Sequence, residues 1–332
     1  MSTVTRSSET KSAARRRAKN PFTKYLVLYL ALTIGSVWAL TVFMVIDYDM
    51  VVSVIGELEL TNPVVIIILH SPAIAALIVL FAYDGWRGIA NFARTLVPRR
   101  KDLIWLGGLM LIMAVYIFAV RYLAMLFGIE VPAEPIPPLD MLLTFLSMFV
   151  MEIGMVAIAI GWFGFFLPYM HRVTGSRVWA GVATGIGIGV FVAPGNIFAS
   201  FELATAWPLY VTQLVVLGIG MSMLLTVGKG NILFFLLPFW VSASGSWLDL
   251  YNFDKPTQLV QLGLFSTLVV VLWLVLRRRP GGLAAPHTFP EYLENEYTTA
   301  QVAPIPGRGN RSQELVALAG AESVTAVGQA AE

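Results

Sequence analysis

Eight apolar runs of roughly membrane-crossing length dominate this sequence and restrict the folds open to it. They occupy residues 25–46, 64–82, 104–127, 141–170, 178–198, 209–227, 231–247 and 257–276. A helical crossing needs about 20 apolar residues, and helices satisfy their own backbone hydrogen bonds inside a bilayer. Hydrophobic residues make up 57% of the chain and charged residues 13%, against about half and about a quarter in soluble domains. The sequence therefore predicts an all-α integral membrane protein with about eight transmembrane helices.

Lysine and arginine are distributed very unevenly between the segments that flank these runs. Eighteen of them fall on one side, in residues 1–24, 83–103, 171–177, 228–230 and 277–279. The opposite loops hold one, Lys255, and are acidic instead. Because loops rich in Lys and Arg stay on the cytoplasmic side, we expect both termini in the cytoplasm.

Three segments follow from this pattern. Residues 1–24 contain seven Lys or Arg among small polar residues, and we expect them to form a cytoplasmic arm. The first apolar run follows and has no signal-peptide cleavage motif. Residues 25–279 form the predicted membrane domain of eight spans. Residues 280–332 are rich in Pro, Gly, Ala and Ser, which predicts a disordered cytoplasmic tail. The absence of cysteine excludes disulfides, thiolate metal sites and a cysteine nucleophile.

One pair of spans has an alternative interpretation. Only the turn Gly228-Lys229-Gly230 separates the runs 209–227 and 231–247, and the second run is short for a crossing. These residues could form a re-entrant hairpin in place of two full spans.

The stretch Gly161-Trp162-Phe163-Gly164-Phe165-Phe166-Leu167-Pro168 resembles the E-E-x-G-W-R-G-x-L-x-P signature of the CAAX-protease and bacteriocin-processing (CPBP, or Abi) intramembrane proteases. The elements around it resemble that family in order and spacing. They are Ser71-Pro72-Ala73-Ile74-Ala75-Ala76-Leu77 with Gly85-Trp86-Arg87-Gly88, then Trp179-Ala180 with Phe191-Val192-Ala193-Pro194, then Thr226-Val227-Gly228-Lys229-Gly230-Asn231. The resemblance covers residues 65–247 and implies the CPBP helical fold in a bacterial plasma membrane.

The residues that carry the family's chemistry are replaced. Its two glutamates, its arginine, its histidine and its H-x-x-x-N pair correspond here to Ile158, Ala159, Phe163, Val192, Trp240 and Ser244. The family uses a glutamate to activate water, histidines that support it and an asparagine that stabilises the oxyanion, which requires a base and preorganised donors. The first four of these side chains can neither accept nor donate a proton, and Trp240 can only donate one.

The resemblance therefore implies a non-catalytic pseudo-protease that binds a hydrophobic peptide, a lipid or a partner helix in its membrane cavity. We expect the six replaced positions to line one apolar cavity in the cytoplasmic half. The expected partners are the lipid bilayer and a hydrophobic peptide or another membrane protein, with no nucleic acid and no cofactor. No metal is expected, because His70, His171 and His287 lack paired ligand spacing.

Glu152 is a carboxylate deep in an apolar run, where a charge is costly and needs a partner. We favour the interpretation that Glu152 forms a structural ion pair with Arg121 on the preceding span. A second interpretation leaves Glu152 and Arg121 as separate residues, protonated or snorkelling. A third places Glu152 in the family signature in a shifted register, as a catalytic base.

The sequence is compatible with two other functions. The chain could be an active intramembrane endopeptidase, for CAAX-type processing or bacteriocin maturation or immunity, that uses Glu152. It could also be a small-molecule transporter, although such proteins often show inverted repeats, and none is evident here. The glycines 181, 185 and 189 have the small-xxx-small spacing of a helix packing face.

Overall fold

The computed structural model describes residues 23–57, 62–98, 100–133, 136–151, 153–198, 207–227, 231–252, 254–279 and 282–283. Within this part, seven helices are long and apolar enough to cross a membrane: Thr23–Ile46, Ser71–Thr95, Asp102–Leu126, Gly154–Thr174, Arg177–Pro194, Pro208–Leu225 and Lys255–Arg277. Two shorter apolar helices, Pro138–Met148 and Leu233–Trp247, accompany them. This helical composition indicates an integral membrane protein.

The first crossing is a continuous rod with a π-helical turn in its middle. It consists of α2 (Thr23–Leu30), η1 (Ala31–Gly35) and α3 (Ser36–Ile46). At its far end α4 (Tyr48–Ile55) begins where the Asp47 side chain accepts a hydrogen bond from the Met50 N–H, a typical N-cap. The chain then returns through α5 (Pro63–Leu69), which the Asn62 side chain caps in the same way, and through the first half of α6 (Ser71–Thr95).

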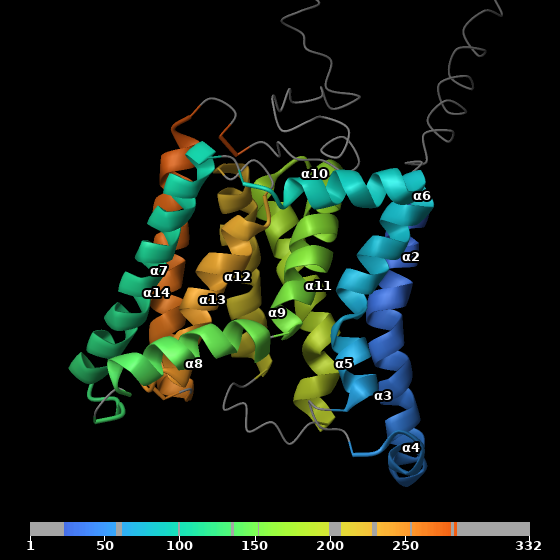
Figure 1. The fold of residues 1–332 in the computed structure, drawn as a ribbon, viewed down its shortest axis with the longest axis horizontal. Coiled ribbons are helices and arrows are strands. Elements are labelled where there is room, and N and C mark those ends of the chain that lie inside the picture. Colours follow the sequence, from blue (N-terminus) through green and yellow to red (C-terminus); the bar gives the residue numbers. More distant parts are fainter. Residues whose placement is uncertain are drawn as a thin grey trace, which may run out of the picture.

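Helix α6 changes direction after its first half. Asp84 and Gly85 have non-helical backbone angles, and Gly85 has a φ of 57°, which glycine adopts without strain. Beyond this kink the helix runs sideways over the end of the bundle where α2 begins and α14 (Lys255–Arg277) ends (Figure 1). The return crossing thus ends near residue 83, close to the predicted end at 82.

The predicted run 141–170 is wrong as a single span. After α7 (Arg100–Leu126), helix α8 (Pro138–Met151) runs across the bundle, and α9 (Ile153–Ile158), η2 (Ala159–Phe166) and α10 (Leu167–Thr174) then climb along it (Figure 1). A run of this length exceeds the about 20 residues of one crossing, so its first half lies sideways. Exposed leucines 139, 142, 143 and 146 mark the outward face of α8.

The last four helices alternate in direction and agree with the predicted runs to within two residues. They are α11 (Arg177–Phe198), α12 (Trp207–Val227), α13 (Leu233–Trp247) and α14 (Figure 1). Helix α13 has 15 residues, so at 1.5 Å per residue it is about 22 Å long. It is shorter than the about 30 Å hydrocarbon core of a bilayer.

Glycines bring α11 and α12 into backbone contact. A Cβ on Gly181 would meet the Cα of Ile219 at 2.5 Å, and one on Gly185 would overlap the backbone of Leu214 and Val215. A Cβ on Gly218 of α12 would likewise overlap the Gly181 carbonyl. Gly189 is different, because its nearest neighbours are methyl groups of Val211 at ordinary contact distances of 3.4 Å or more. The glycine stripe is therefore a packing face, as its spacing indicates.

The centre of the protein is the stretch that carries the family-like signature. Most residues of the helix Gly154–Thr174 are buried inside the protein, whereas only a few of Lys255–Arg277 are. Trp162, Phe163 and Phe165 have at most 1% of their surface exposed. The ring of Tyr29 on α2 packs edge-on against Trp162, with ring centroids 5.8 Å apart, and η2 is thereby enclosed by the first crossing.

Candidate functional site

The six replaced family positions lie on four neighbouring elements, and the structure brings five of them into one hydrophobic cluster. Ala159, Phe163 and Trp240 are buried members of this cluster, and Ile158 and Val192 are partly buried against it. Ser244 is fully buried, and its hydroxyl donates to the Val241 carbonyl at 2.8 Å within α13. The side chains at these positions therefore pack in the core of the helical bundle.

Aromatic side chains fill the space around two of these positions. The Phe163 ring lies 4.3 Å from the ring of Phe235 on α13, measured between centroids. The Trp240 indole stacks on Phe145 of α8 at 4.1 Å, and its Nε1 donates to the Phe145 carbonyl at 3.0 Å. The stacking holds α8 sideways against α13. It also places two large rings where the resemblance expects an arginine and a histidine.

Of the predicted ion pair, only Arg121 lies among the described residues. Arg121 on α7 donates from Nη1 to the Leu250 carbonyl at 2.8 Å and to the Asp249 carbonyl at 3.4 Å. Its Nη2 donates to the Pro132 carbonyl at 3.0 Å. Arg121 therefore fastens the loop after α7 to the loop after α13. Glu152 lies outside the described residues, so its pairing with Arg121 stays a prediction.

A cavity of about 590 Å³ lies between α7, α9, α11, α12, α13 and α14. It is lined by Tyr116, Ile158, Ile188, Tyr210, Gln213, Leu214, Leu217, Phe239, Ser242, Ala243, Ser246, Trp247, Tyr251, Gln261, Leu262 and Phe265. Its volume falls in the usual range of small-molecule sites, about 300–1,000 Å³. Ile158 is the one replaced family position among these lining residues.

The cavity lies toward the end of the bundle opposite the first residue of α2 and the last of α14. Its lining residues come from the beginnings of α12 and α14 and from the end of α13. The sequence predicts a cavity at the other, basic end, built from the six replaced positions. The cavity described above lies in the half where the loops are acidic, and a cavity built from the six replaced positions stays a prediction.

Hydrogen-bonding groups line this cavity among the aromatic rings. Tyr116 donates to the Gln261 carbonyl at 3.3 Å, and the Gln213 side-chain amide donates to the Gln258 carbonyl at 3.3 Å. Tyr251 donates to the Ser242 carbonyl at 3.5 Å. These bonds join α7 and α12 to α14 and the loop after α13 to α13 itself. The polar residues Ser242, Ser246 and Gln261 also line the cavity.

The cavity is electrically neutral over the physiological pH range. None of the described residues that line it is Asp, Glu, Lys, Arg or His. Burial raises the pKa of Tyr251 to about 12, although a hydrogen bond with Gln261 lowers it in part. The phenol therefore keeps its proton, since its pKa lies well above the pH of a cell. A ligand with a net charge would find no counter-charge here.

A buried polar pair that sequence reasoning missed lies at the basic end of the bundle. The Nε2 atom of His171 on α10 lies 2.7 Å from the Oγ atom of Ser222 on α12, in a hydrogen bond. His171 is 2% exposed and Ser222 is fully buried. The sequence places His171 in a loop, whereas it lies within α10 and packs inward. The only signal was a histidine close to an apolar run, which does not identify its partner.

The described part of the chain contains no set of side chains that could bind a metal ion. No group of three or more His, Asp or Glu residues lies close enough together there to hold an ion. His70 is occupied locally, because its Nδ1 lies 2.7 Å from the Ile66 carbonyl one turn earlier.

The described fold and cavity define a class: a helical membrane protein with a neutral, aromatic-lined cavity between its helices. No protein-family model matches this sequence. No curated protein matches it either.

Proposed function

We propose that this chain is a non-catalytic membrane protein that binds an uncharged, lipid-like amphiphile in the cavity between α7, α9 and α11–α14. The observation that carries this proposal is the cavity itself. It combines six aromatic side chains, aliphatic side chains and neutral hydrogen-bonding groups in one space of about 590 Å³. An acyl chain suits the apolar walls, and a hydroxyl or ester group suits the tyrosines and glutamines.

The resemblance to the CPBP proteases supports a pseudo-protease origin for such a binding protein. At its degenerate positions, Phe163 and Trp240 pack against other rings, and Ser244 bonds within its own helix. Proton transfer needs a titratable group within reach of water, and apolar or self-bonded side chains supply none. We therefore propose that binding replaced proteolysis in this chain.

We also propose that the chain crosses the membrane eight times, with both ends of the helical domain in the cytoplasm. The seven long helices become eight crossings when α13 is counted, and α13 connects two helices that run in the opposite direction to it (Figure 1). The distribution of 18 Lys and Arg against one supports this orientation. The cavity then opens in the outer half of the membrane.

Binding is tested on purified protein by native mass spectrometry with two probes of equal chain length, monooleoylglycerol and lysophosphatidylglycerol. We expect retention of the neutral probe over the anionic one. Ala243→Trp fills the cavity and should abolish that retention. Gly263→Ala, on α14 at a position with no heavy atom within 4 Å of the added Cβ, should retain the probe like the wild type. Equal retention by wild type and Ala243→Trp would exclude this cavity as the binding site.

Loss of catalysis is tested with a panel of membrane peptides and three proteins: wild type, Phe163→Ala and Glu152→Gln. We expect no cleavage by any of them. Cleavage by the wild type that Glu152→Gln abolishes would favour the protease alternative and overturn the proposal.

A further inference from the structure

The sideways half of α6 forms a distinct surface helix, residues 86–95, at the basic end of the bundle, and Leu96 and Val97 follow it directly (Figure 1). Its inner side is fixed to the core. Phe92 is 3% exposed and Thr95 is 3% exposed. A Cβ on Gly164 of η2 would meet the Phe92 ring at 2.9 Å. The surface helix is therefore held in a defined orientation against the buried centre of the protein.

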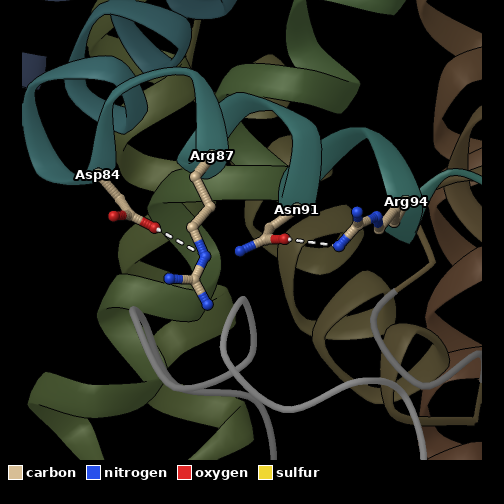
Figure 2. A network of polar contacts seen from close by, with 4 residues as sticks. All are labelled: Asp84, Arg87, Asn91 and Arg94. Carbon is tan, nitrogen blue, oxygen red and sulfur yellow. Dashed lines mark hydrogen bonds and ion pairs between the residues drawn. The ribbon is translucent and has the colours of Figure 1, made fainter.

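The polar side of this helix carries two arginines, Arg87 and Arg94, about two turns apart along the helix. Figure 2 shows Asp84, Arg87, Asn91 and Arg94 projecting toward the same side. Arg87 Nε lies 3.9 Å from Asp84 Oδ2, and the two side chains are 82% and 42% exposed. Arg94 Nη1 donates to Asn91 Oδ1 at 3.1 Å. An arginine has five N–H donors, so each guanidinium keeps donors for an external acceptor.

The third side is apolar and exposed. Trp86 is 75% exposed and Val97 is 69% exposed. At the start of α7, Ile104 and Trp105 are 80% and 66% exposed. Tryptophan next to arginine is typical of a helix that lies at the boundary between headgroups and acyl chains.

The charge of the segment favours an anionic surface. Residues 83–103 contain five Lys or Arg and two Asp, a net charge of +3. Basic residues next to a membrane attract its anionic lipids, by about 1 kcal/mol each. Trp86 contacts the ring of Phe81, with centroids 5.3 Å apart, but keeps 75% of its surface exposed. A soluble anion would satisfy the arginines but would leave this apolar surface in water. A phospholipid headgroup with its acyl chains satisfies both.

We propose that the surface helix binds anionic phospholipids of the adjacent leaflet, with Arg87 and Arg94 on the phosphate groups and Trp86 beside the acyl chains. Phosphate oxygens accept two parallel hydrogen bonds from a guanidinium, which an exposed aspartate at 3.9 Å does not achieve. This inference is independent of the cavity, which lies toward the other end of the bundle.

The test compares dioleoyl phosphatidylglycerol with dioleoyl phosphatidylcholine on the full-length protein, by native mass spectrometry of lipid-bound states. The double substitution Arg87→Gln and Arg94→Gln should weaken the phosphatidylglycerol preference about 5- to 30-fold. The control is Arg277→Gln with Arg278→Gln, at the last residue of α14 and the residue after it, which removes the same charge from the same end of the bundle.

We expect the control to keep most of the preference, and all proteins to keep the same melting temperature. Equal loss in both double variants would show a general charge effect and overturn a site on the surface helix. An unchanged preference in the Arg87 and Arg94 variant would overturn it as well, and would leave the exposed helix as a surface for another protein. A further variant, Trp86→Ala, tests the apolar contact, and we expect it to weaken the binding of both lipids.

Discussion

Gly161 of η2 lies so close to Pro72 of α6 that a methyl group at position 161 would overlap the proline ring and its carbonyl group. The contact joins the two stretches in which the sequence most resembles the CPBP family, which are far apart along the chain. It also explains why a glycine occurs in a helix where a larger residue would form more apolar contacts. The backbones of the two helices approach each other at this point.

Gly161→Ala should lower the stability of the protein, because neither the backbone nor the ring of Pro72 can move far to accept a methyl group. We expect a loss of about 1–3 kcal/mol, the usual cost of overpacking. The measurement is the melting temperature of the detergent-solubilised protein. Gly154→Ala on the preceding turns is the control, since no heavy atom lies within 4 Å of its added Cβ. If both alanines lowered the melting temperature equally, the contact with Pro72 would not be the cause.

Two glycines of α11, Gly185 and Gly189, allow a test of helix packing together with its control. Gly185→Ala places a methyl group against the backbone of Leu214 and Val215, whereas Gly189→Ala meets only Val211 methyl groups at 3.4 Å or more. We expect Gly185→Ala to separate α11 from α12 and to cost about 1–3 kcal/mol. Gly189→Ala should be neutral or slightly stabilising, because alanine favours a helix over glycine by about 1 kcal/mol. Melting curves of the two variants should therefore shift in opposite directions or by clearly different amounts.

Apolar runs bounded by charges predicted the positions of α11, α12 and α14 well, because a bilayer crossing imposes a length that sequence shows directly. They could not predict that the run 141–170 divides into a sideways α8 and an ascending α9. That division depends on the stacking of Phe145 on Trp240, a contact between helices that hydropathy does not encode. The kink of α6 has a local signal in Gly85, but its sideways course depends on the contact of Phe92 with Gly164.

The cavity could not be predicted for a related reason. Its polar groups come from separate helices, Tyr116 from α7, Gln213 from α12 and Gln261 from α14, and each one looks like an isolated polar residue in its own apolar run. Which faces of the helices meet is decided by packing across the whole bundle. The six positions chosen by resemblance identified the packed centre, since five of them share one cluster.

Reporter fusions test the orientation of the bundle. Fusions at the N-terminus and at residues 90, 174 and 300 should report the cytoplasm, and fusions near 55 and 135 should report the outside. The physical reason is the concentration of Lys and Arg on one side of the apolar runs. A fusion at 230 adds a test of α12 and α13, and should also report the cytoplasm if α13 completes a crossing. A cytoplasmic signal at 55 or 135 would contradict the eight-span topology.

Arg121 offers a test that separates a hydrogen-bonding role from a purely electrostatic one. Its guanidinium bridges the carbonyls of Pro132 and Leu250, on two different loops. Lysine keeps the charge but has no planar fork with which to reach both loops. We expect Arg121→Lys to cost about 1.5–3 kcal/mol, the range for hydrogen bonds to a charged group, as a fall in melting temperature. Arg121→Leu should cost at least as much.

The double variant with Glu152→Gln then tests the predicted ion pair. Removing one charge of a buried pair leaves the other without compensation, so a pair predicts that Glu152→Gln partly restores the stability lost in Arg121→Leu. With the carbonyl contacts alone, the two losses should simply add. Rescue together with a clear loss in Arg121→Lys would show that Arg121 serves both the loops and Glu152. An Arg121→Lys variant as stable as the wild type would show that neither loop carbonyl depends on the guanidinium fork.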